Sequence, residues 1–219
     1  HTAGVIASFV LSNSFGLSHG FEFFNDRTRE IEGGDPEKVA SEVVDVATSW
    51  IQGQVLPPFL LWLHFYDPHY PYTPPEPFRS RFADDPYDGE IAYMDDAIGS
   101  FLEQLEDRGW LTDTLVVVVA DHGEGLDERH ETTHGYFLYD NTLRVPLILA
   151  GPGVPEGRVV TEQVTMADLM PTFLEAFALP VDTESRDGRS FWSELQGGRL
   201  EQRPAIVENR SLRNQFGWA

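Results

Sequence analysis

Short apolar stretches alternate along the chain with segments whose apolar residues recur every three or four positions. Apolar runs of about four to eight residues indicate buried strands, and the wider spacing indicates amphipathic helices. Strands are predicted at residues 5–11, 59–65, 115–120 and 145–150, with a last one at 205–207. Helices are predicted from residue 36, at 88–108 and at 166–178. This alternation predicts an α/β domain with a mostly parallel central sheet.

Single residues mark where some of these elements begin or end. Asp35 is a candidate N-cap, with Pro36 at the first helical position. Gly109 is expected to end the long helix, because glycine tolerates the left-handed conformation common at helix C-termini. The valine-rich run at 115–120 is the best candidate for a central parallel strand. No internal repeat or linker divides the chain, so a single domain is expected.

The charge balance narrows the classes of partner. With 15 basic and 36 acidic residues the net charge is −21, whereas nucleic acids and anionic membranes need clustered Lys and Arg. We therefore expect neither as a partner. Lys38 is the only lysine, which fits either adaptation to high salt or codon bias with an acidic surface.

The rest of the composition allows a folded domain. Hydrophobic residues make up 41% of the chain, enough to bury a core. No apolar run approaches the roughly 18–20 residues of a membrane span. The absence of Cys excludes disulfides and a Cys nucleophile within these residues.

Two loops that follow predicted strands carry candidate chemistry. Asp67-Pro68-His69 follows the second strand, and Asp121-His122-Gly123 follows the third. Functional groups of α/β sheets gather beyond the carboxyl ends of strands, and a carboxylate beside an imidazole suits a divalent ion. The alternative is a turn in which Asp121 caps backbone N–H groups. A polar loop then leads to His134, so we expect convergence at one sheet edge of His69, Asp121, His122 and His134.

A series of short motifs runs in order along most of the chain. They are Thr2-Ala3-Gly4-Val5, Asp67-Pro68-His69, Tyr87-Asp88-Gly89-Glu90-Ile91-Ala92-Tyr93-Met94-Asp95, Asp121-His122-Gly123-Glu124-Gly125-Leu126, His134-Gly135, Arg144-Val145-Pro146-Leu147, Asp168-Leu169-Met170-Pro171-Thr172 and Gly188. Together they resemble the sulfatase family of the alkaline phosphatase superfamily. The resemblance implies a three-layer alkaline-phosphatase-like α/β fold with a mostly parallel central sheet, incomplete at both ends. Residues 1–219 would then be a partial catalytic domain that largely lacks the N-terminal nucleophile segment and the C-terminal subdomain.

The resemblance also implies roles for individual residues. It implies one divalent metal ion, commonly Ca²⁺, with Mg²⁺ and Mn²⁺ as alternatives, and Asp121 and His122 match two of its ligands. His69 matches the residue that hydrogen-bonds the ester or donates a proton to the leaving oxygen. His134 matches the Lys or His that contacts the sulfate oxygens. Cationic donors that neutralise oxygen charge and an imidazole with a pKa near neutrality suit such a reaction.

Two departures from the family pattern qualify this interpretation. Arg129 stands where relatives often have His, and His130 where they have Gly, so His130 is either an auxiliary of the site or a solvated loop histidine. The family nucleophile is a formylglycine made within a Cys/Ser-x-Pro-x-Arg motif, which this sequence lacks. We expect that nucleophile and an acidic metal pair upstream of His1. The chain by itself is therefore expected neither to bind metal tightly nor to turn over.

The resemblance leaves three functions to weigh. The first is hydrolysis of sulfate esters of small molecules or saccharides by the intact protein. The second is hydrolysis of phosphomonoesters, phosphodiesters or phosphonates by a member of the same superfamily. A two-zinc site is disfavoured, since Pro71 and not His lies four residues after Asp67. The third is an inactive, truncated binding module. No feature of the sequence indicates a compartment or an oligomeric state.

Overall fold

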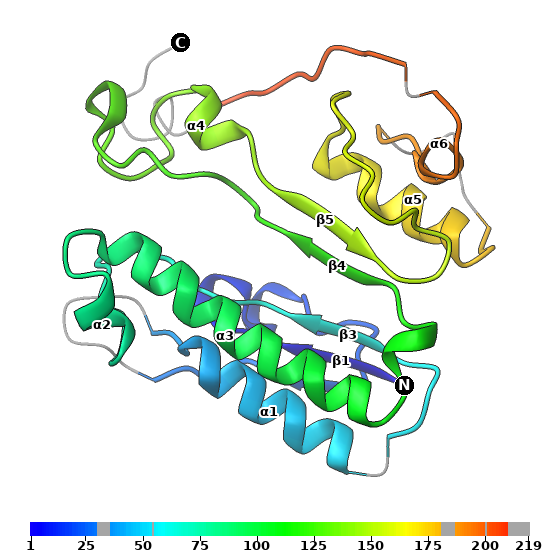
Figure 1. The fold of residues 1–219 in the computed structure, drawn as a ribbon, viewed down its shortest axis with the longest axis horizontal. Coiled ribbons are helices and arrows are strands. Elements are labelled where there is room, and N and C mark those ends of the chain that lie inside the picture. The colour runs from blue at the N-terminus through cyan, green and yellow to red at the C-terminus, as the bar shows by residue number, and fades with distance from the viewer. Residues whose placement is uncertain (30–35, 54, 181–186, 200, 210–219) are drawn as a thin grey trace. The chain divides into compact units, whose positions relative to one another are not determined.

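A computed structural model describes residues 1–29, 36–53, 55–180, 187–199 and 201–209. The chain divides into two compact units, His1–Leu111 and Thr112–Ala219. Each unit has strands, helices and apolar clusters of its own (Figure 1). None of the helices in the described ranges is both long and apolar enough to cross a membrane.

The first unit contains a parallel three-stranded sheet. Its strands are β1 (Thr2–Val5), β2 (Phe23–Asn25) and β3 (Leu60–Leu63), in the order β2-β1-β3. Its helices are α1 (Ala40–Gln52), α2 (Phe78–Arg81) and α3 (Pro86–Asp107). Short 3-10 turns lie at Phe9–Leu11 and Asn13–Phe15, and another at Leu111–Asp113 spans the boundary between the units.

Helices α1 and α3 cover one face of this sheet (Figure 1). Apolar residues at helical spacing bury one stripe of each helix. The shared cluster consists of Ala40, Val44, Ala47 and Ile51 of α1 with Ala97, Phe101 and Leu105 of α3. Leu61 and Leu63 of β3 pack against it. The first unit therefore has a core formed by two helices on a parallel sheet.

The other face of the sheet is aromatic around Gly4. Phe24 and Trp62 lie opposite Gly4 on the two neighbouring strands. Phe21 covers this row, with ring centroids 5.6 Å from Phe24 and 6.1 Å from Trp62. A Cβ on Gly4 would lie 2.8 Å from Cδ2 of Phe24. Glycine is therefore required here by the close approach of an aromatic ring.

The second unit contains an antiparallel strand pair. It consists of β4 (Val116–Val119) and β5 (Leu147–Ala150). The helices are α4 (Asp140–Leu143), α5 (Leu169–Ala176) and α6 (Trp192–Leu195), with 3-10 turns at Glu128–His130 and Met166–Asp168. Buried Phe191 and Leu195 pack against Leu147 and Leu149 of β5 and against Leu169 of α5.

Several boundaries differ from the sequence-based predictions. The strand predicted at 5–11 ends at Val5, because the chain turns at Phe9–Leu11 and leaves Phe9 and Val10 exposed. The helix predicted from residue 36 begins at Ala40, so Pro36 precedes it, and Asp35 lies outside the described residues. The helix at 166–178 begins with a 3-10 turn and ends at Ala176. Residues 205–207 form no strand, and Ile206 is exposed.

Strand β4 differs in direction from the prediction. A parallel central strand was expected at 115–120, but the pairing described for β4 is antiparallel, with β5. A parallel crossover needs about a dozen residues, usually including a helix that packs back onto the sheet. Only the four-residue α4 lies between the two strands, together with the 3-10 turn at Glu128–His130. By contrast, α3 ends where expected, with Gly109 at φ 70°.

The aromatic contact at Gly4 yields a stability prediction. Gly4→Val should lower the free energy of unfolding of the full-length protein by about 1–3 kcal/mol, because the side chain overpacks against Phe24. Gly99→Ala on α3 is the control, since its Cβ meets nothing within 4 Å and alanine favours a helix by up to about 1 kcal/mol. Urea unfolding curves measure both, and unchanged stability of Gly4→Val would contradict the close approach.

Candidate active site

The loop after β3 fixes the orientation of His69. The His69 ring stacks on Tyr66 with centroids 4.0 Å apart, and Nε2 lies 3.0 Å from the Tyr66 hydroxyl. Nδ1 lies 2.8 Å from the carbonyl oxygen of Tyr70. Nδ1 therefore carries the hydrogen and donates it to that carbonyl, while Nε2 accepts from Tyr66. The partner Tyr66 was not identified from the sequence.

Asp67 is held in the same loop next to other acidic groups. Burial raises the pKa of Asp67 to about 6, and the charge of Glu42 adds to the rise. Hydrogen bonds from backbone amides, including that of Ala40, lower the pKa but do not outweigh burial. Its Oδ2 is buried and has no hydrogen-bond partner among the described residues. Burial thus favours the neutral form of this carboxyl.

Asp121 and His122 follow β4, and the Asp121 carboxylate lies near the His122 imidazole. Oδ1 of Asp121 accepts from the backbone N–H of His122 at 2.9 Å, and it lies 3.6 Å from Nε2 of the same residue. Nδ1 of His122 lies 2.8 Å from the carbonyl oxygen of Gly123 and donates to it. The lone pair of Nε2 and the carboxylate are therefore both available as ligands. The predicted cap on a backbone N–H is present here, and the metal-ligand role of the pair stays a prediction.

His134 joins this pair through ring stacking. The rings of His122 and His134 lie 3.8 Å apart between centroids at an interplanar angle of 29°. Oε1 of Glu124 lies 3.3 Å from Nδ1 of His134 and also accepts from the N–H of Gly125. Since the Glu124 side chain is only 6% exposed, it orients the imidazole from within the fold. In the sequence, only the position of Glu124 directly after Asp121-His122-Gly123 indicated that it could orient His134.

Two glycines let the backbone pack tightly around the site. A Cβ on Gly123 would collide with the carbonyl oxygen of Asn141, and one on Gly125 with the carbonyl oxygens of Glu131 and Thr133. Gly123 donates to the carbonyl of Thr142 at 2.8 Å, and Gly125 to that of Thr133 at 2.7 Å. The polar loop after β4 is therefore fastened at both ends by close backbone contacts.

Two further residues that hold the His134 loop were missed in the sequence. Glu131 is 3% exposed, and its Oε1 accepts from the N–H groups of Tyr136 at 2.8 Å and Phe137 at 3.2 Å. Asn209 donates to the carbonyls of Gly135 and Tyr136 at 2.9 and 2.8 Å. Glu131 lies at the end of the signature loop and Asn209 begins an Asn-x-Ser sequence, but neither pattern indicates a contact with the backbone after His134.

The loop between Gly125 and His134 contains several residues in the left-handed backbone conformation. Leu126, Asp127, Arg129 and His130 have φ values of 50°, 61°, 55° and 66°. This region favours glycine, which matches the Gly usual at the position of His130 in the resembling loops. His130 is solvent-exposed, and Arg129 lies over the Tyr139 ring at 4.8 Å. An auxiliary role for His130 stays a prediction.

Asp168 organises the segment that precedes α5. Its Oδ2 accepts from the N–H and hydroxyl of Thr165 at 2.8 and 3.0 Å, and its Oδ1 accepts from the N–H of Arg189 at 2.7 Å and from the Arg203 guanidinium. Burial raises the pKa of Asp168, but these hydrogen bonds outweigh it and hold the pKa below its usual value. Glycine at position 188 lets the backbone before Arg189 pack against that of Ala167, because a Cβ there would collide with the carbonyl oxygen of Ala167.

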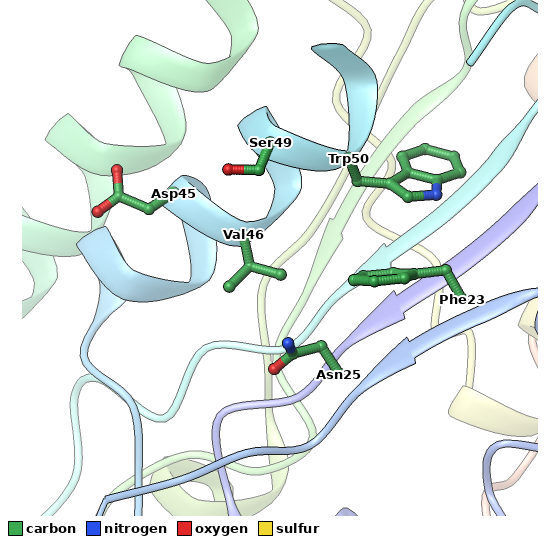
Figure 2. A pocket seen from close by; sticks show the side chains of 6 residues that line it. All are labelled: Phe23, Asn25, Asp45, Val46, Ser49 and Trp50. Atoms are coloured by element: carbon green, nitrogen blue, oxygen red, sulfur yellow. The ribbon is translucent and has the colours of Figure 1, made fainter. Parts of the chain in front are cut away.

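A separate cavity of about 380 Å³ lies in the first unit. Figure 2 shows its lining, in which α1 residues face two residues of β2. The lining residues are Phe23, Asn25, Asp45, Val46, Ser49 and Trp50. None of the residues predicted as catalytic or metal-binding contributes to it.

The comparison with known proteins decides the family. The sequence profile of the family described as Sulfatase matches residues 9–179. The chain belongs to the sulfatase family. Arylsulfatase D of Homo sapiens is 29% identical over 213 residues, covering 89% of this chain and 36% of that protein. The low-salt glycan biosynthesis sulfotransferase Agl7 of Haloferax volcanii is 30% identical over 232 residues, covering 88% of this chain and 56% of that protein. This sulfatase chain thus spans about a third to just over half of these relatives.

Solved structures confirm the fold of the sulfatase chain. The phosphonate monoester hydrolase of Agrobacterium radiobacter superposes with a TM-score of 0.67 at 22% identity, covering 85% of this chain and 51% of that one. A 2-O GAG sulfatase superposes with a TM-score of 0.67 at 18% identity, covering 93% and 56%. At such identities the likeness shows the fold, so the expected alkaline-phosphatase-like α/β fold is confirmed.

The predicted site residues are divided between the two units of the sulfatase chain. Asp121, His122 and His134 lie together in the second unit, whereas His69 belongs to the first. Convergence of His69 with the others stays a prediction. Within the described ranges, no group of three or more His, Cys, Asp or Glu side chains is arranged to hold a metal ion. A metal-ligand role for Asp121 and His122 stays a prediction.

The Asp168 network yields a second stability prediction. Asp168→Asn should lower the free energy of unfolding of the full-length protein by roughly 2–4 kcal/mol at pH 7, because it removes the charge that pairs with Arg203. An Asp carboxyl in the unfolded chain has a pKa of about 3.9, and the pKa of Asp168 in the folded protein is lower. The stabilisation is therefore present above about pH 4 and is lost as the pH falls through the folded pKa.

Urea unfolding of wild type and variant between pH 7 and pH 3 measures this effect. The gap between the two unfolding free energies should narrow toward the acid end. Glu175→Gln, at an exposed position of α5, is the control and should leave stability nearly unchanged. Equal destabilisation by the two variants would count against the network.

Proposed function

We propose that the chain forms part of the catalytic domain of a hydrolase of sulfate monoesters of small molecules or saccharides. The observation that carries this proposal is the stack of His122 on His134 beside Asp121, within the residues matched by the sulfatase profile. Two imidazoles and a carboxylate at a strand end can bind the oxygens of a tetrahedral anion and a cation that neutralises it.

The side chains of this chain would divide the work of ester cleavage. His134, when protonated, donates a hydrogen bond from Nε2 to a sulfate oxygen, and the buried carboxylate of Glu124 accepts from Nδ1 and keeps the ring in orientation. His69, when protonated, gives its Nε2 proton to the leaving oxygen, so the alcohol departs uncharged. The Tyr66 hydroxyl, now 3.0 Å from Nε2, has to turn away or relay that proton.

Asp121 and His122 would supply one oxygen and one nitrogen ligand to a divalent ion, with Ca²⁺ favoured and Mg²⁺ or Mn²⁺ as alternatives. Such an ion, when bound, neutralises charge on the sulfate oxygens. Because these two residues fill only part of a coordination sphere, further ligands would come from elsewhere in the protein. The sequence contains no Cys/Ser-x-Pro-x-Arg motif, so a formylglycine nucleophile would also come from outside these residues.

A second candidate function is hydrolysis of phosphonate monoesters or of phosphate mono- and diesters. The superposition on a phosphonate monoester hydrolase supports it, since sulfate and phosphoryl groups present similar oxygens to the same donors. The ratio of kcat/KM for 4-nitrophenyl sulfate to that for a 4-nitrophenyl phosphonate ester, measured on the full-length protein, separates the two. A ratio well above one supports the sulfatase reaction, and a ratio well below one overturns it.

Removing a metal ligand should abolish most activity. In the full-length protein, Asp121→Ala is expected to reduce kcat/KM for a sulfate ester by about 100-fold or more, because charge neutralisation of the sulfate oxygens is lost. Asp113→Ala, at an exposed position before β4, is the control and should retain activity. Near-normal turnover of Asp121→Ala would refute the metal-ligand role.

The 219-residue chain by itself should be inactive. It is expected to bind Ca²⁺ weakly and to hydrolyse no sulfate ester, because Asp121 and His122 offer only two ligands and no nucleophile motif is present. Calcium titration by calorimetry and an assay with 4-nitrophenyl sulfate check this. Measurable turnover by the purified chain would contradict the division of the site proposed above.

A further inference from the structure

Glu90 on α3 bridges the two ends of the segment that carries His69. Its Oε2 accepts from the backbone N–H of His69 at 3.1 Å, and its Oε1 accepts from that of Thr73 at 2.6 Å. The residue is 6% exposed, so these hydrogen bonds are shielded from water and stronger than at a surface. One carboxylate therefore fixes the backbone on both sides of Tyr70.

The start of α3 is a rigid support for this carboxylate. Asp85 caps the helix by accepting from the N–H of Asp88 at 3.3 Å, and Pro86 stands at its first position. Gly89 lies against buried Pro74, since a Cβ there would be 2.8 Å from Pro74 Cγ. The loop is thus held by a steric contact at Pro74 and by the two hydrogen bonds to Glu90.

We propose that Glu90 is a positioning residue for His69, a role that rests on the function proposed above for the His69 imidazole. Glu90 touches no substrate in this role. It anchors the His69 main chain, while the carbonyl of Tyr70 and the ring of Tyr66 set the imidazole itself. Because the ring cannot keep its direction if its own backbone moves, loss of the Glu90 carboxylate misdirects Nε2.

The charge state of Glu90 decides whether it can hold both amides. An ionised carboxylate accepts at both oxygens, whereas a protonated one carries a hydrogen on one of them. Burial raises the pKa of Glu90 to about 7, against the hydrogen bonds from Thr73 and His69 and with the charges of Asp67 and Glu37 adding to the rise. The titratable groups that face Glu90 are therefore Asp67 and His69 of the loop after β3 and Glu37 of the segment before α1. Arg29 and Glu42 in turn lower and raise the pKa of Asp67.

It follows that the His69 loop is held firmly above about pH 7 and loosens as the pH falls through that value. The His69 imidazole therefore loses its direction on the acid side of that pH.

The first experiment measures hydrogen exchange of the His69 and Thr73 amides in the full-length protein. Glu90→Gln keeps the shape of the side chain but places an amide group where an acceptor is needed. Protection factors at both amides should fall by about tenfold or more, while that of buried Leu105 on α3 stays the same. Glu103→Gln, at an exposed position of the same helix, is the matched control. Unchanged protection at His69 and Thr73 would overturn the assignment.

The wild-type protein gives a test that needs no variant. Protection factors at the same two amides should fall as the pH is lowered from 8 to 6, and those of Leu105 should not. If Glu90→Gln fails to fold, this titration still decides the matter, since constant protection across that range would contradict the role of the ionised carboxylate.

The second experiment uses the identity of the leaving group. A general acid matters most for a poor leaving group, so Glu90→Gln should reduce kcat by roughly 10- to 100-fold on an alkyl sulfate. On 4-nitrophenyl sulfate the loss should be less than about threefold, with KM little changed. His69→Ala should show the same dependence on the leaving group. Equal losses on the two esters would indicate a general structural defect and overturn the positioning role.

The outcomes separate the two proposals. A wild-type protein that hydrolyses neither ester refutes the sulfatase function, and the amide protection then decides by itself whether Glu90 holds the loop. A wild-type protein that hydrolyses both esters, combined with equal losses in Glu90→Gln, supports the function and refutes the role of Glu90.

Discussion

Three carboxylates with exposures of 6% or less each accept hydrogen bonds from at least two backbone amides: Glu90, Glu131 and Asp168. Loops that leave a strand carry N–H groups that no neighbouring strand satisfies, and a buried one without an acceptor costs about 1–3 kcal/mol. A carboxylate meets two such groups at once. One of the three loops held in this way carries His69, one follows His134 and one precedes α5. Buried acids therefore set the backbone geometry beside two of the predicted site histidines.

This constraint changes the meaning of the acidic composition. The net charge of −21 suggests a surface covered by solvated carboxylates, yet several acids act inside the fold. Burial raises the pKa of Glu90 to about 7 and of Asp67 to about 6, whereas hydrogen bonds hold that of Asp168 below its usual value. The proposed site for an anionic ester combines imidazoles with the carboxylates of Asp121 and Glu124, so its local charge is set by these groups and not by the overall balance.

Close backbone packing explains the signature loop after β4. Gly123 and Gly125 lie against carbonyl oxygens where a Cβ would collide, and the turn that follows runs through left-handed conformations up to His130. The departure from the family at His130 therefore replaces a glycine at a φ of 66°. His134, which follows this loop, stacks on His122 and lies within hydrogen-bond distance of Glu124.

The sequence by itself determined the α/β class, the positions of α3, β3, β4 and β5 to within a few residues, and the motifs that carry Asp121, His122 and His134. Periodicity and strand-end motifs are local, and local spacing records which face of an element is buried. Only the tertiary structure decided that β4 pairs antiparallel with β5 and that Tyr66, Glu90, Glu124, Glu131 and Asn209 hold the site loops. The contacts of Glu90, Glu131 and Asn209 join a side chain to a backbone amide or carbonyl, which for Asn209 lies 73 or 74 residues away along the chain. Such groups are present at nearly every residue, so their pairing leaves no pattern in the sequence.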